Sequence, residues 1–289
     1  MNRYAALTVL YNPDSDYIKN IESYINEVEK VYVLDNSTQP NNNEEEISQI
    51  KKCKYVKLDN SQGLAYALNI GCNNALEDGF DYIITMDQDS CFEEGAVRKL
   101  IDFIESSTSH YAIVAPNVRS IYNDAKTGEN KIAFQTIDVK TNKECSWVMT
   151  SGSLMCLEDY KAVNGFDNNL FIDHIDIDMG IRLFLHKKKI IMIGDAIIYQ
   201  RFGNSIPKKL FGRTICPYFG SPIRQYYRSR NTVYLYNKYG KKITKKFLHH
   251  PSKGIIKVLL FEDKKIKKVK MYLKGRIEGK KGITGKYLE

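Results

Sequence analysis

The sequence lacks the features that would assign it to several large classes of protein. No apolar run among its 289 residues approaches the roughly 18 residues that a membrane-spanning helix requires. None of its 6 cysteines forms a Cys-x-x-Cys pair, which argues against a structural zinc site. No internal repeat or low-complexity linker is present, and a hydrophobic fraction of 43% excludes a disordered polypeptide. What remains is a globular protein that can bury one large core or two modest ones.

A secretory signal is also absent from the first residues. The chain begins with Met-Asn-Arg and continues into a mixed strand, without the apolar segment that export requires. We therefore expect a cytoplasmic protein whose cysteines are free thiols in a reducing compartment.

Acidic and basic residues are unevenly distributed along the chain. Residues 201–289 contain 24 Lys or Arg and 4 Asp or Glu, whereas residues 1–200 contain 19 and 30. Such asymmetry suggests two tasks. The acidic part is suited to a metal ion or a catalytic carboxylate. The basic part is suited to a phosphate-rich partner such as nucleic acid, an anionic membrane or a ligand. The alternative is a solvated basic face that keeps the protein soluble.

Short apolar runs alternate with amphipathic segments in the first third of the chain. The runs at Tyr4–Leu10, 31–34, 54–58 and 82–86 predict strands, and the segments at 18–28, 44–50, 64–76 and 96–104 predict helices. Strands that alternate with helices favour a mostly parallel sheet with helices on both faces.

The remainder of the chain is less regular. Residues 120–146 are polar, which fits an insertion or a pair of edge strands. Strands are expected at 147–157 and 190–199, and helices are expected after Asp173–Asp178 as far as His186 and over 222–239. Basic amphipathic helices follow from Lys241 onward.

Polar residues follow each of the first four predicted strands. They are Tyr11-Asn12, Asp35-Asn36, Asp59-Asn60 and Asp87-Gln88-Asp89. Ligands of open α/β sheets bind at the carboxyl ends of the strands. Four consecutive strands that deliver polar residues to one edge therefore predict a ligand site there.

An ordered set of motifs spans most of the chain. It comprises Thr8–Pro13, Val31–Ser37, Asn60–Ala65 with Asn69-Ile70-Gly71, Asp87-Gln88-Asp89, Thr150–Leu154, Phe171–Arg182 and Tyr226-Tyr227-x-x-Arg230-Asn231. Together these motifs resemble the family 2 glycosyltransferases of the GT-A fold. They are most similar to the bacterial rhamnosyltransferase-like members that build cell-surface polysaccharides.

The resemblance implies an α/β protein with a Rossmann-like, mostly parallel sheet. Residues 1–205 would form the GT-A catalytic domain and residues 206–289 a basic helical region. The implied reaction is an inverting transfer of rhamnose from dTDP-rhamnose to a saccharide acceptor, which would be lipid-linked. Another donor, such as a UDP-sugar, is the alternative.

The Asp-x-Asp motif would hold a divalent metal ion, Mg²⁺ or Mn²⁺. In the resemblance, Asp89 binds the metal, and Asp87 contacts the ribose or a metal-bound water. A hard cation held by carboxylates stabilises the departing diphosphate. On spacing alone, a turn or a helix-capping box that begins at Ser90 is the alternative.

The resemblance also assigns the donor-binding residues. Asp35 would accept a hydrogen bond from the pyrimidine, and Thr8 and Tyr11 would flank this base. The other donor-side residues would be Asn12, Asn60, Gly63, Asn69 and Gln88. Ordinary loop and turn geometry is the competing interpretation of these positions.

The acceptor hydroxyl must lose a proton as it attacks, and a carboxylate is the expected base. Alignment with the family's pattern implies that Asp176 is this base. Asp173 is the next candidate for the base, or it would instead hold the acceptor or the donor sugar. Ser151 and Gly152 would line the same pocket. The alternative is that the acidic residues cap a helix and favour its dipole. His174 lies in the same acidic cluster; it is expected to be a solvated loop residue, and a role in the site is the alternative.

One departure from the family pattern concerns the metal site. Many relatives have a His shortly before a Gly after the strand that ends here at Tyr199, whereas this chain reads Gln200-Arg201-Phe202-Gly203. Gln200 would coordinate through its carbonyl oxygen, or Arg201 would offset phosphate charge directly.

The basic C-terminal region has three possible uses. It could hold the protein peripherally at the inner face of the cell membrane, where each Lys or Arg contributes about 1 kcal/mol. It could dock the diphosphate of the acceptor through Lys208, Lys209, Arg224 or Arg228, or it could simply cover the catalytic domain.

Other function classes fit less well. A nucleotidyltransferase would require a Gly-rich loop after the first strand, where Tyr11-Asn12-Pro13 contains no glycine. A nucleic-acid-binding protein would leave the four polar strand ends unexplained, so no nucleic-acid partner is expected. A non-catalytic protein that binds nucleotide sugars is the remaining alternative.

Overall fold

A 10-stranded sheet forms the centre of the protein, and its long path follows the order β3-β2-β1-β4-β9-β6-β10-β5. The computed structural model describes residues 2–14, 16–123, 129–201, 208–210, 213–215, 219–248 and 251–288. The strands are β1 (Tyr4–Leu10), β2 (Lys30–Asp35), β3 (Cys53–Lys57), β4 (Tyr82–Asp87), β5 (Ser90–Phe92), β6 (Ile113–Asn123), β7 (Asn130–Gln135), β8 (Lys143–Cys145), β9 (Ser153–Cys156) and β10 (Ile190–Arg201). β7 pairs with β6 and β8 with β10, and β11 (Lys208–Leu210) and β12 (Arg213–Ile215) form a separate hairpin.

The strand directions bring distant parts of the chain to one edge of the sheet. β3, β2, β1 and β4 are parallel neighbours. β9 runs antiparallel to both β4 and β6, and β6 is parallel to β10. The carboxyl ends of β1, β2, β3, β4 and β10 therefore meet at the same edge as the beginning of β9. We call this the carboxyl edge.

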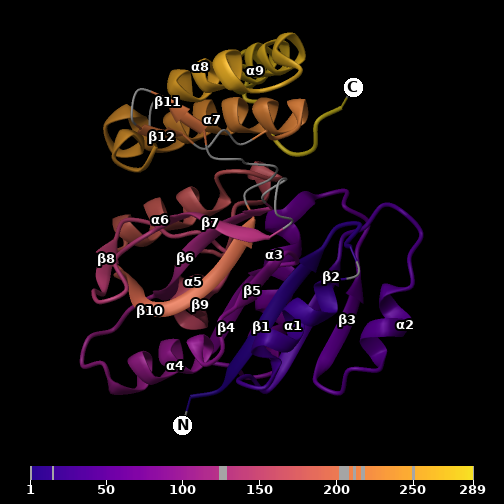
Figure 1. The fold of residues 1–289 in the computed structure, drawn as a ribbon, viewed down its shortest axis with the longest axis vertical. Coiled ribbons are helices and arrows are strands. Elements are labelled where there is room, and N and C mark those ends of the chain that lie inside the picture. The colour runs from indigo at the N-terminus through magenta and orange to yellow at the C-terminus, as the bar shows by residue number, and fades with distance from the viewer. Residues whose placement is uncertain are drawn as a thin grey trace.

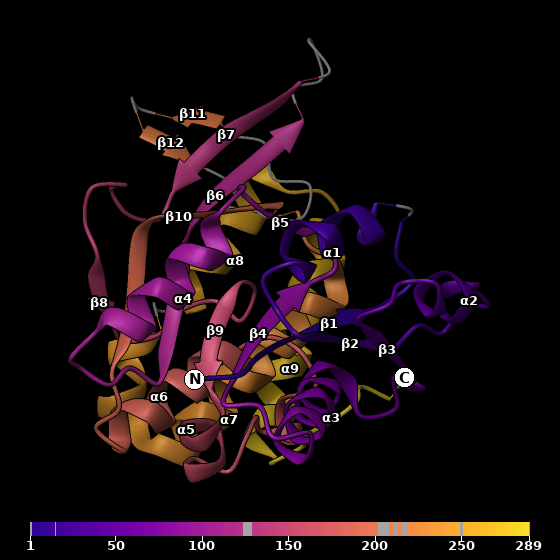
Figure 2. The same cartoon turned by 90° about the horizontal axis from the view of Figure 1, so that it is seen from below.

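Helices cover both faces of the sheet, as expected from the sequence. They are α1 (Tyr17–Ile25), α2 (Asn43–Ser48), α3 (Gly63–Glu77), α4 (Ala96–Ser106), α5 (Leu157–Ala162) and α6 (Ile175–Leu185). One apolar core joins α3, α5 and α6 to the sheet, and the other joins α1, α2 and α4 to the opposite face. Figure 2, which views the molecule of Figure 1 from below, shows α1 and α4 on one side of the sheet and α3, α5 and α6 on the other.

Alternation along each strand feeds both cores. In β1, Ala5 and Leu7 join the core under α3, whereas Tyr4 and Ala6 join the core under α1. Successive side chains of a strand point to opposite faces, so an uninterrupted apolar strand must be covered on both sides. The strands and helices predicted up to Ser106 are confirmed, with small shifts at their ends.

The middle of the chain differs from the sequence-based expectation. The strand predicted at 147–157 is wrong in length, because β9 begins at Ser153 after a turn. Gly152 has a φ of 80° in this turn and donates its N–H to the Thr85 carbonyl oxygen at 2.7 Å. β5 and β6 were not predicted. Of the two expectations for 120–146, edge strands are confirmed by β7 and β8.

Three C-terminal helices stack over the carboxyl edge (Figure 1). They are α7 (Pro222–Phe247), α8 (Pro251–Phe261) and α9 (Lys265–Lys280), and α7 is interrupted by the non-helical backbone of Gly240. α9 packs closely along α7 because Gly275 and Gly279 face the Tyr226 and Arg230 carbonyl groups without an intervening side chain. The proposed boundary between residues 205 and 206 lies outside the described residues.

Two expectations from composition can be compared with the described residues. Cys53, Cys72, Cys91, Cys145 and Cys156 are free, while Cys216 lies outside them. In the described part of the chain, no helix combines the length and the apolar character needed to cross a bilayer.

We predict that Gly275→Ala destabilises the protein by about 1–3 kcal/mol, because a methyl group there would overlap the Tyr226 carbonyl oxygen and force α9 away from α7. Urea unfolding measures the change. Gly254→Ala in α8 is the matched control. A Cβ atom at Gly254 meets no neighbour within 4 Å, and helix propensity favours Ala. Equal stability of both variants would contradict close packing of α7 on α9.

Candidate active site

Three strands are joined at the carboxyl edge by the side chain and backbone of Asp87. Gln200 at the end of β10 donates its Nε2–H to Asp87 Oδ2 at 2.8 Å. The Asp87 N–H donates to Ser151 Oγ, just before β9, at 3.2 Å. The structure therefore brings together two residues predicted from the sequence, Asp87 and Ser151. Gln200, which stands where many relatives have a His, lies beside them.

Negative charge is concentrated around Asp87. Burial, together with the nearby charges of Asp89 and Asp176, raises the pKa of Asp87 to about 7, although Arg224 and Gln200 oppose the rise. Burial also raises the pKa of Asp89, and Arg201 acts in the opposite direction. Carboxylates in this environment favour protonation or a cationic ligand.

Two polar oxygens at this edge lack partners among the described residues. Gln200 Oε1 and Ser90 Oγ are both buried and accept or donate no hydrogen bond there. The two residues face each other in the β5–β10 ladder. Buried polar atoms are normally satisfied, so an unpaired carbonyl oxygen beside two carboxylates is suited to a hard cation.

Asp176 lies in the first turn of α6 and shares a narrow cavity with Thr85 and Thr150. Its Oδ1 accepts the Ile177 N–H at 2.9 Å. Burial raises the pKa of Asp176 to about 6, with a further contribution from the charge of Asp173. A carboxylate that titrates near neutrality can both accept and release a proton.

Asp173 is held by two arginines of α7. Its Oδ2 lies 2.9 Å from Arg224 Nε, and its Oδ1 accepts from Arg224 Nη2 at 2.9 Å and from Arg228 Nε at 3.4 Å. The two-point contact with Arg224 fixes the orientation of the carboxylate as well as its charge. The arginines considered as phosphate ligands thus meet a site carboxylate in this structure.

The expectation for His174 is wrong, because this residue is not a solvated loop histidine. It adopts a left-handed conformation with a φ of 65° at the start of α6, and its Nε2 lies 3.0 Å from Thr232 Oγ1. Burial lowers the pKa of His174 to about 4. His174 is therefore neutral near pH 7 and joins the start of α6 to α7.

Asp178 has a structural role. It is completely buried and forms ion pairs with Arg182 at 2.7 Å and Lys238 at 3.0 Å, and the Tyr239 hydroxyl donates to it at 2.7 Å. Arg182 is thus paired with an acid of its own helix. Of the two acids in the first turn of α6, Asp178 is thus occupied by ion pairs, and Asp176 is the one near the carboxyl edge of the sheet.

The loops after β1, β2 and β4 are also linked. Gln88 Oε1 accepts the Tyr11 N–H at 2.7 Å, and Gln88 Nε2 donates to the Tyr11 carbonyl at 3.4 Å. The Asn12 N–H donates to Ser37 Oγ at 2.8 Å. The side chain of Tyr11 is half exposed, so it can contact a ligand while its backbone is fixed.

Asp35 is completely buried and its carboxylate is surrounded by donors. Its Oδ1 accepts the Ser37 N–H at 2.8 Å, and its Oδ2 accepts from the Tyr55 hydroxyl at 2.7 Å and Lys57 Nζ at 3.0 Å. Asn43 Nδ2 donates to the same oxygen. Although burial alone would raise the pKa of Asp35, these donors hold it far below its usual value.

In this conformation Asp35 joins β2 to β3 and α2. A base could reach its carboxylate if one of the four donors moved, so its contact with a pyrimidine stays a prediction. Sequence reasoning missed Tyr55 and Lys57. Tyr55 and Lys57 lie two residues apart in β3, so their side chains are on the same face of the sheet. Lys57 is also the register partner of Asp35 in the parallel β2–β3 pair, and this alternation could have indicated both residues as partners of Asp35.

The other donor-side residues have identifiable structural contacts. Asn60 donates its N–H to Asn36 Oδ1 at 2.8 Å and accepts from Asn36 Nδ2 at 3.0 Å. Gly63 has a φ of 82°, and a Cβ atom there would overlap Phe171. Thr8 is buried in the sheet. Their roles in donor binding stay predictions.

Asn69 and Gly152 are also fixed by contacts within the protein. Asn69 Nδ2 donates to the Phe166 carbonyl at 2.8 Å, and Asn69 Oδ1 accepts the Phe166 N–H at 2.7 Å. These bonds tie α3 to the loop before α6. Gly152 packs against Ile198 and Pro116. Neither contact tests the predicted ligand role, which stays a prediction.

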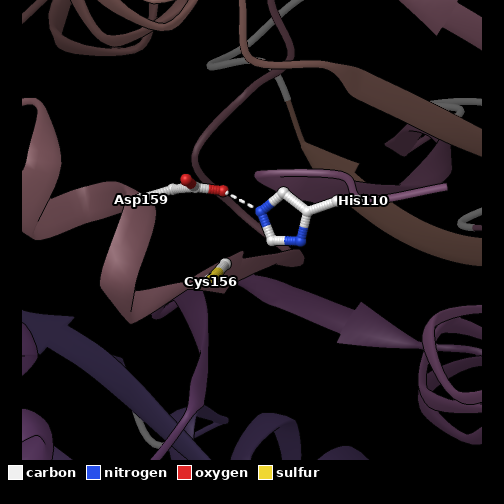
Figure 3. A group of neighbouring side chains, drawn as sticks. All are labelled: His110, Cys156 and Asp159. Atoms are coloured by element: carbon white, nitrogen blue, oxygen red, sulfur yellow. Dashed lines mark hydrogen bonds and ion pairs between the residues drawn. The ribbon is translucent and has the colours of Figure 1, made fainter.

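A second group of possible metal ligands consists of His110, Cys156 and Asp159 (Figure 3). It lies at the opposite edge, since Cys156 pairs with Tyr82 at the start of β4. Asp159 is already paired with His110 Nε2 at 2.6 Å and Lys188 Nζ at 2.5 Å. Burial raises the pKa of the Cys156 thiol, so this group is adequately explained as an ion-pair network.

Comparison with known proteins supplies independent findings. Residues 7–162 match the family model described as glycosyl transferase family 2. The dTDP-rhamnosyl transferase RfbF of Shigella flexneri is 28% identical over 305 residues, which cover 98% of this chain and 97% of the relative.

Solved structures share the architecture. The structure of GalNAc-T7 with UDP, GalNAc and Mn²⁺ has a TM-score of 0.61 and 12% identity; the match covers 96% of this chain but 54% of that protein. The structure of TarS 1–349 of S. aureus with UDP-GlcNAc has a TM-score of 0.59 and 11% identity, with coverages of 97% and 81%.

Proposed function

Because the chain belongs to glycosyl transferase family 2 and has the GT-A fold, it is a glycosyltransferase, and we propose that it transfers rhamnose from dTDP-rhamnose to a saccharide acceptor. Similarity to the dTDP-rhamnosyl transferase over nearly the whole chain supports this donor. A different nucleotide sugar, such as a UDP-sugar, is the alternative donor within the same reaction.

The convergence of Asp87, Asp89 and Asp176 at one edge is the observation that carries the proposal. Asp87 lies close enough to both other carboxylates for their charges to raise its pKa. Donor phosphates and acceptor hydroxyl must meet within one site, and residues from β4 and α6 provide groups suited to each. A protein that only bound nucleotide sugars would have no need of a buried carboxylate with a raised pKa on the acceptor side.

The proposed reaction is a single displacement with inversion. The acceptor oxygen forms a bond to the anomeric carbon while the bond from that carbon to the leaving diphosphate oxygen breaks. The acceptor proton passes to the carboxylate of Asp176. Asp173, oriented by Arg224 and Arg228, is suited to hold a sugar hydroxyl near this carboxylate. Positioning and electrostatic stabilisation would provide most of the rate enhancement.

The oxygens at the carboxyl edge fit a divalent cation. Asp89 and Asp87 would hold Mg²⁺ or Mn²⁺, with Gln200 Oε1 as a neutral ligand whose partner is lacking among the described residues. When bound, such an ion supplies positive charge to the leaving diphosphate. Arg201, whose charge lowers the pKa of Asp89, is near enough to add to this effect.

We also propose that α8 and α9 contact the inner face of the cell membrane, where a lipid-linked acceptor would be available. Ile256, Leu259 and Leu260 of α8 and Ile266, Leu273 and Ile277 of α9 are all at least half exposed. Lysines accompany these apolar side chains in both helices. Exposed apolar residues together with basic residues favour an anionic membrane surface over nucleic acid.

The membrane proposal predicts flotation with vesicles that contain anionic phosphatidylglycerol and little flotation with neutral phosphatidylcholine vesicles. Leu259→Ser/Leu273→Ser should weaken flotation several-fold, because both side chains would lose their apolar contact with the bilayer. Val139→Ser/Phe134→Ser, which alters exposed apolar residues near β7, is the control. Equal flotation of all three proteins would contradict this surface.

A nucleotide panel tests the donor. We expect dTDP and UDP to raise the melting temperature more than GDP or CMP, and Mn²⁺ to increase the effect, because ligand binding to the folded state adds about 2.7 kcal/mol at 100 times Kd. Asp89→Asn should remove the Mn²⁺ dependence, whereas Asp102→Asn on α4, where Asp102 pairs with Arg98, should not. A largest shift with GDP would overturn the assignment to a pyrimidine nucleotide.

The base assignment predicts that Asp176→Asn lowers kcat by roughly 10²–10⁴-fold while dTDP binding is retained. In the wild-type protein, transfer should decline as the pH falls through about 6, because the carboxylate that accepts the proton becomes protonated. Rate measurements from pH 5 to 8.5 check both expectations.

Thermal unfolding provides the control for folding of Asp176→Asn. The pKa of Asp176 is raised in the folded protein, so its ionised form disfavours folding above pH 6. The variant should therefore melt at the same or a higher temperature at pH 7.5, and the gain should vanish below pH 4. Wild-type turnover by this variant would exclude Asp176 as the base.

A further inference from the structure

A second cavity lies between α7 and α9, outside the candidate active site. Its volume is about 260 Å³, and Ser229, Thr232, Lys241, Lys245, Tyr272 and Arg276 are among its lining residues. A single water requires roughly 10–15 Å³ by this kind of measure, so the space is ample for a polyatomic ligand.

The cavity is strongly cationic. Lys241, Lys245 and Arg276 line it, and no Asp or Glu does. Within the described chain, none of these three cations forms an ion pair with an acid. The Arg276 guanidinium instead donates to the Tyr272 hydroxyl at 3.5 Å. Gathered cations that are not neutralised by the protein favour an anionic ligand.

A buried hydroxyl adds a specific polar group to this charge. Ser229 is 2% exposed, and its Oγ has no hydrogen-bond partner in the part of the chain that the structure describes. Thr232, the next hydroxyl along the cavity, already donates to the Arg228 carbonyl at 2.7 Å and contacts His174. An unsatisfied hydroxyl in a cavity lining that also contains three cations is suited to donate to an oxyanion.

We propose that this cavity binds a phosphate or diphosphate group. Arg276 can donate through two parallel N–H groups, the lysines supply charge, and Ser229 supplies a neutral donor. The phosphate can belong to a free ion or to a lipid headgroup. The exposed Leu273 and Ile277 directly follow the lining residues Tyr272 and Arg276 in α9, so this helix carries both apolar and cationic groups that a lipid phosphate would require.

Thr232 connects the cavity to the loop before α6. This residue lines the cavity and contacts His174, two positions before Asp176 in the sequence. None of the residues assigned to the donor lines the cavity, so a phosphate bound there would occupy a site of its own. The inference concerns a site distinct from the donor site and does not depend on which nucleotide the protein uses.

The first experiment is calorimetric titration with inorganic pyrophosphate in the presence of saturating dTDP. Lys245→Gln/Arg276→Gln should weaken pyrophosphate binding at least tenfold. Lys267→Gln/Lys270→Gln removes the same charge from positions of α9 outside the cavity lining and should change pyrophosphate binding less than twofold. The melting-temperature shift by dTDP should persist in both variants, which separates this test from the proposed function and verifies folding.

The second experiment identifies the source of the phosphate. Wild-type protein and both variants are floated with phosphatidylcholine vesicles, with or without phosphatidic acid. Selective loss of binding to phosphatidic acid in the cavity variant supports a lipid phosphate, and selective loss of pyrophosphate binding alone supports a free ion. If neither ligand distinguishes the cavity variant from its control, the proposal is wrong.

Discussion

The carboxylates of four residues lie close together at the carboxyl edge, and the surrounding structure limits their mutual repulsion. They are Asp87, Asp89, Asp173 and Asp176. The pKa values of Asp87 and Asp176 are raised to about 7 and 6, largely because both groups are removed from water. Arg224 opposes the rise at both residues while it pairs with Asp173. Uncompensated like charges would favour opening of the edge. The basic helix α7 is thus part of the site, although it follows the family-matched residues by some 60 positions.

The same helix holds the loop that leads into α6. Asn231 Nδ2 donates to the carbonyl oxygens of Leu170, Ile172 and Asp173 at 3.0, 2.8 and 2.8 Å. Asp173 and neighbouring residues have positive φ values, which cost about 1–3 kcal/mol each without external support. Arg230, completely buried beside Asn231, adds hydrogen bonds to nearby carbonyls. The late motif seen in the sequence therefore acts as a brace that positions carboxylates, without contacting the edge itself.

The limits of sequence prediction have the same physical origin. β1 to β4 could be predicted because their apolar periodicity is local and polar residues mark their ends. β9 could not be bounded correctly, because its place between β4 and β6 depends on pairing with residues far away in the sequence. The convergence of Asp87 and Asp176 followed from the polar strand ends together with the resemblance to the glycosyltransferase family. The sequence did not show whether Asp35 or Asn69 is free to contact a ligand, because their hydrogen-bond partners come from other elements.

The basic residues of the C-terminal region fall into two groups, those that pair with acids inside the protein and those that do not. Some cations of the last 89 residues serve the interior, as Arg224 does for Asp173 and as Lys268 does for Glu262 at 2.8 Å. With 24 basic and 4 acidic residues after position 200, pairing within this region can neutralise few of them. The remainder must meet water, acids of the first 200 residues or an anionic partner. Exposed apolar side chains lie on the same helices as these cations. A partner with both phosphate and apolar parts would therefore contact both kinds of group, whereas salt or nucleic acid would contact only the cations.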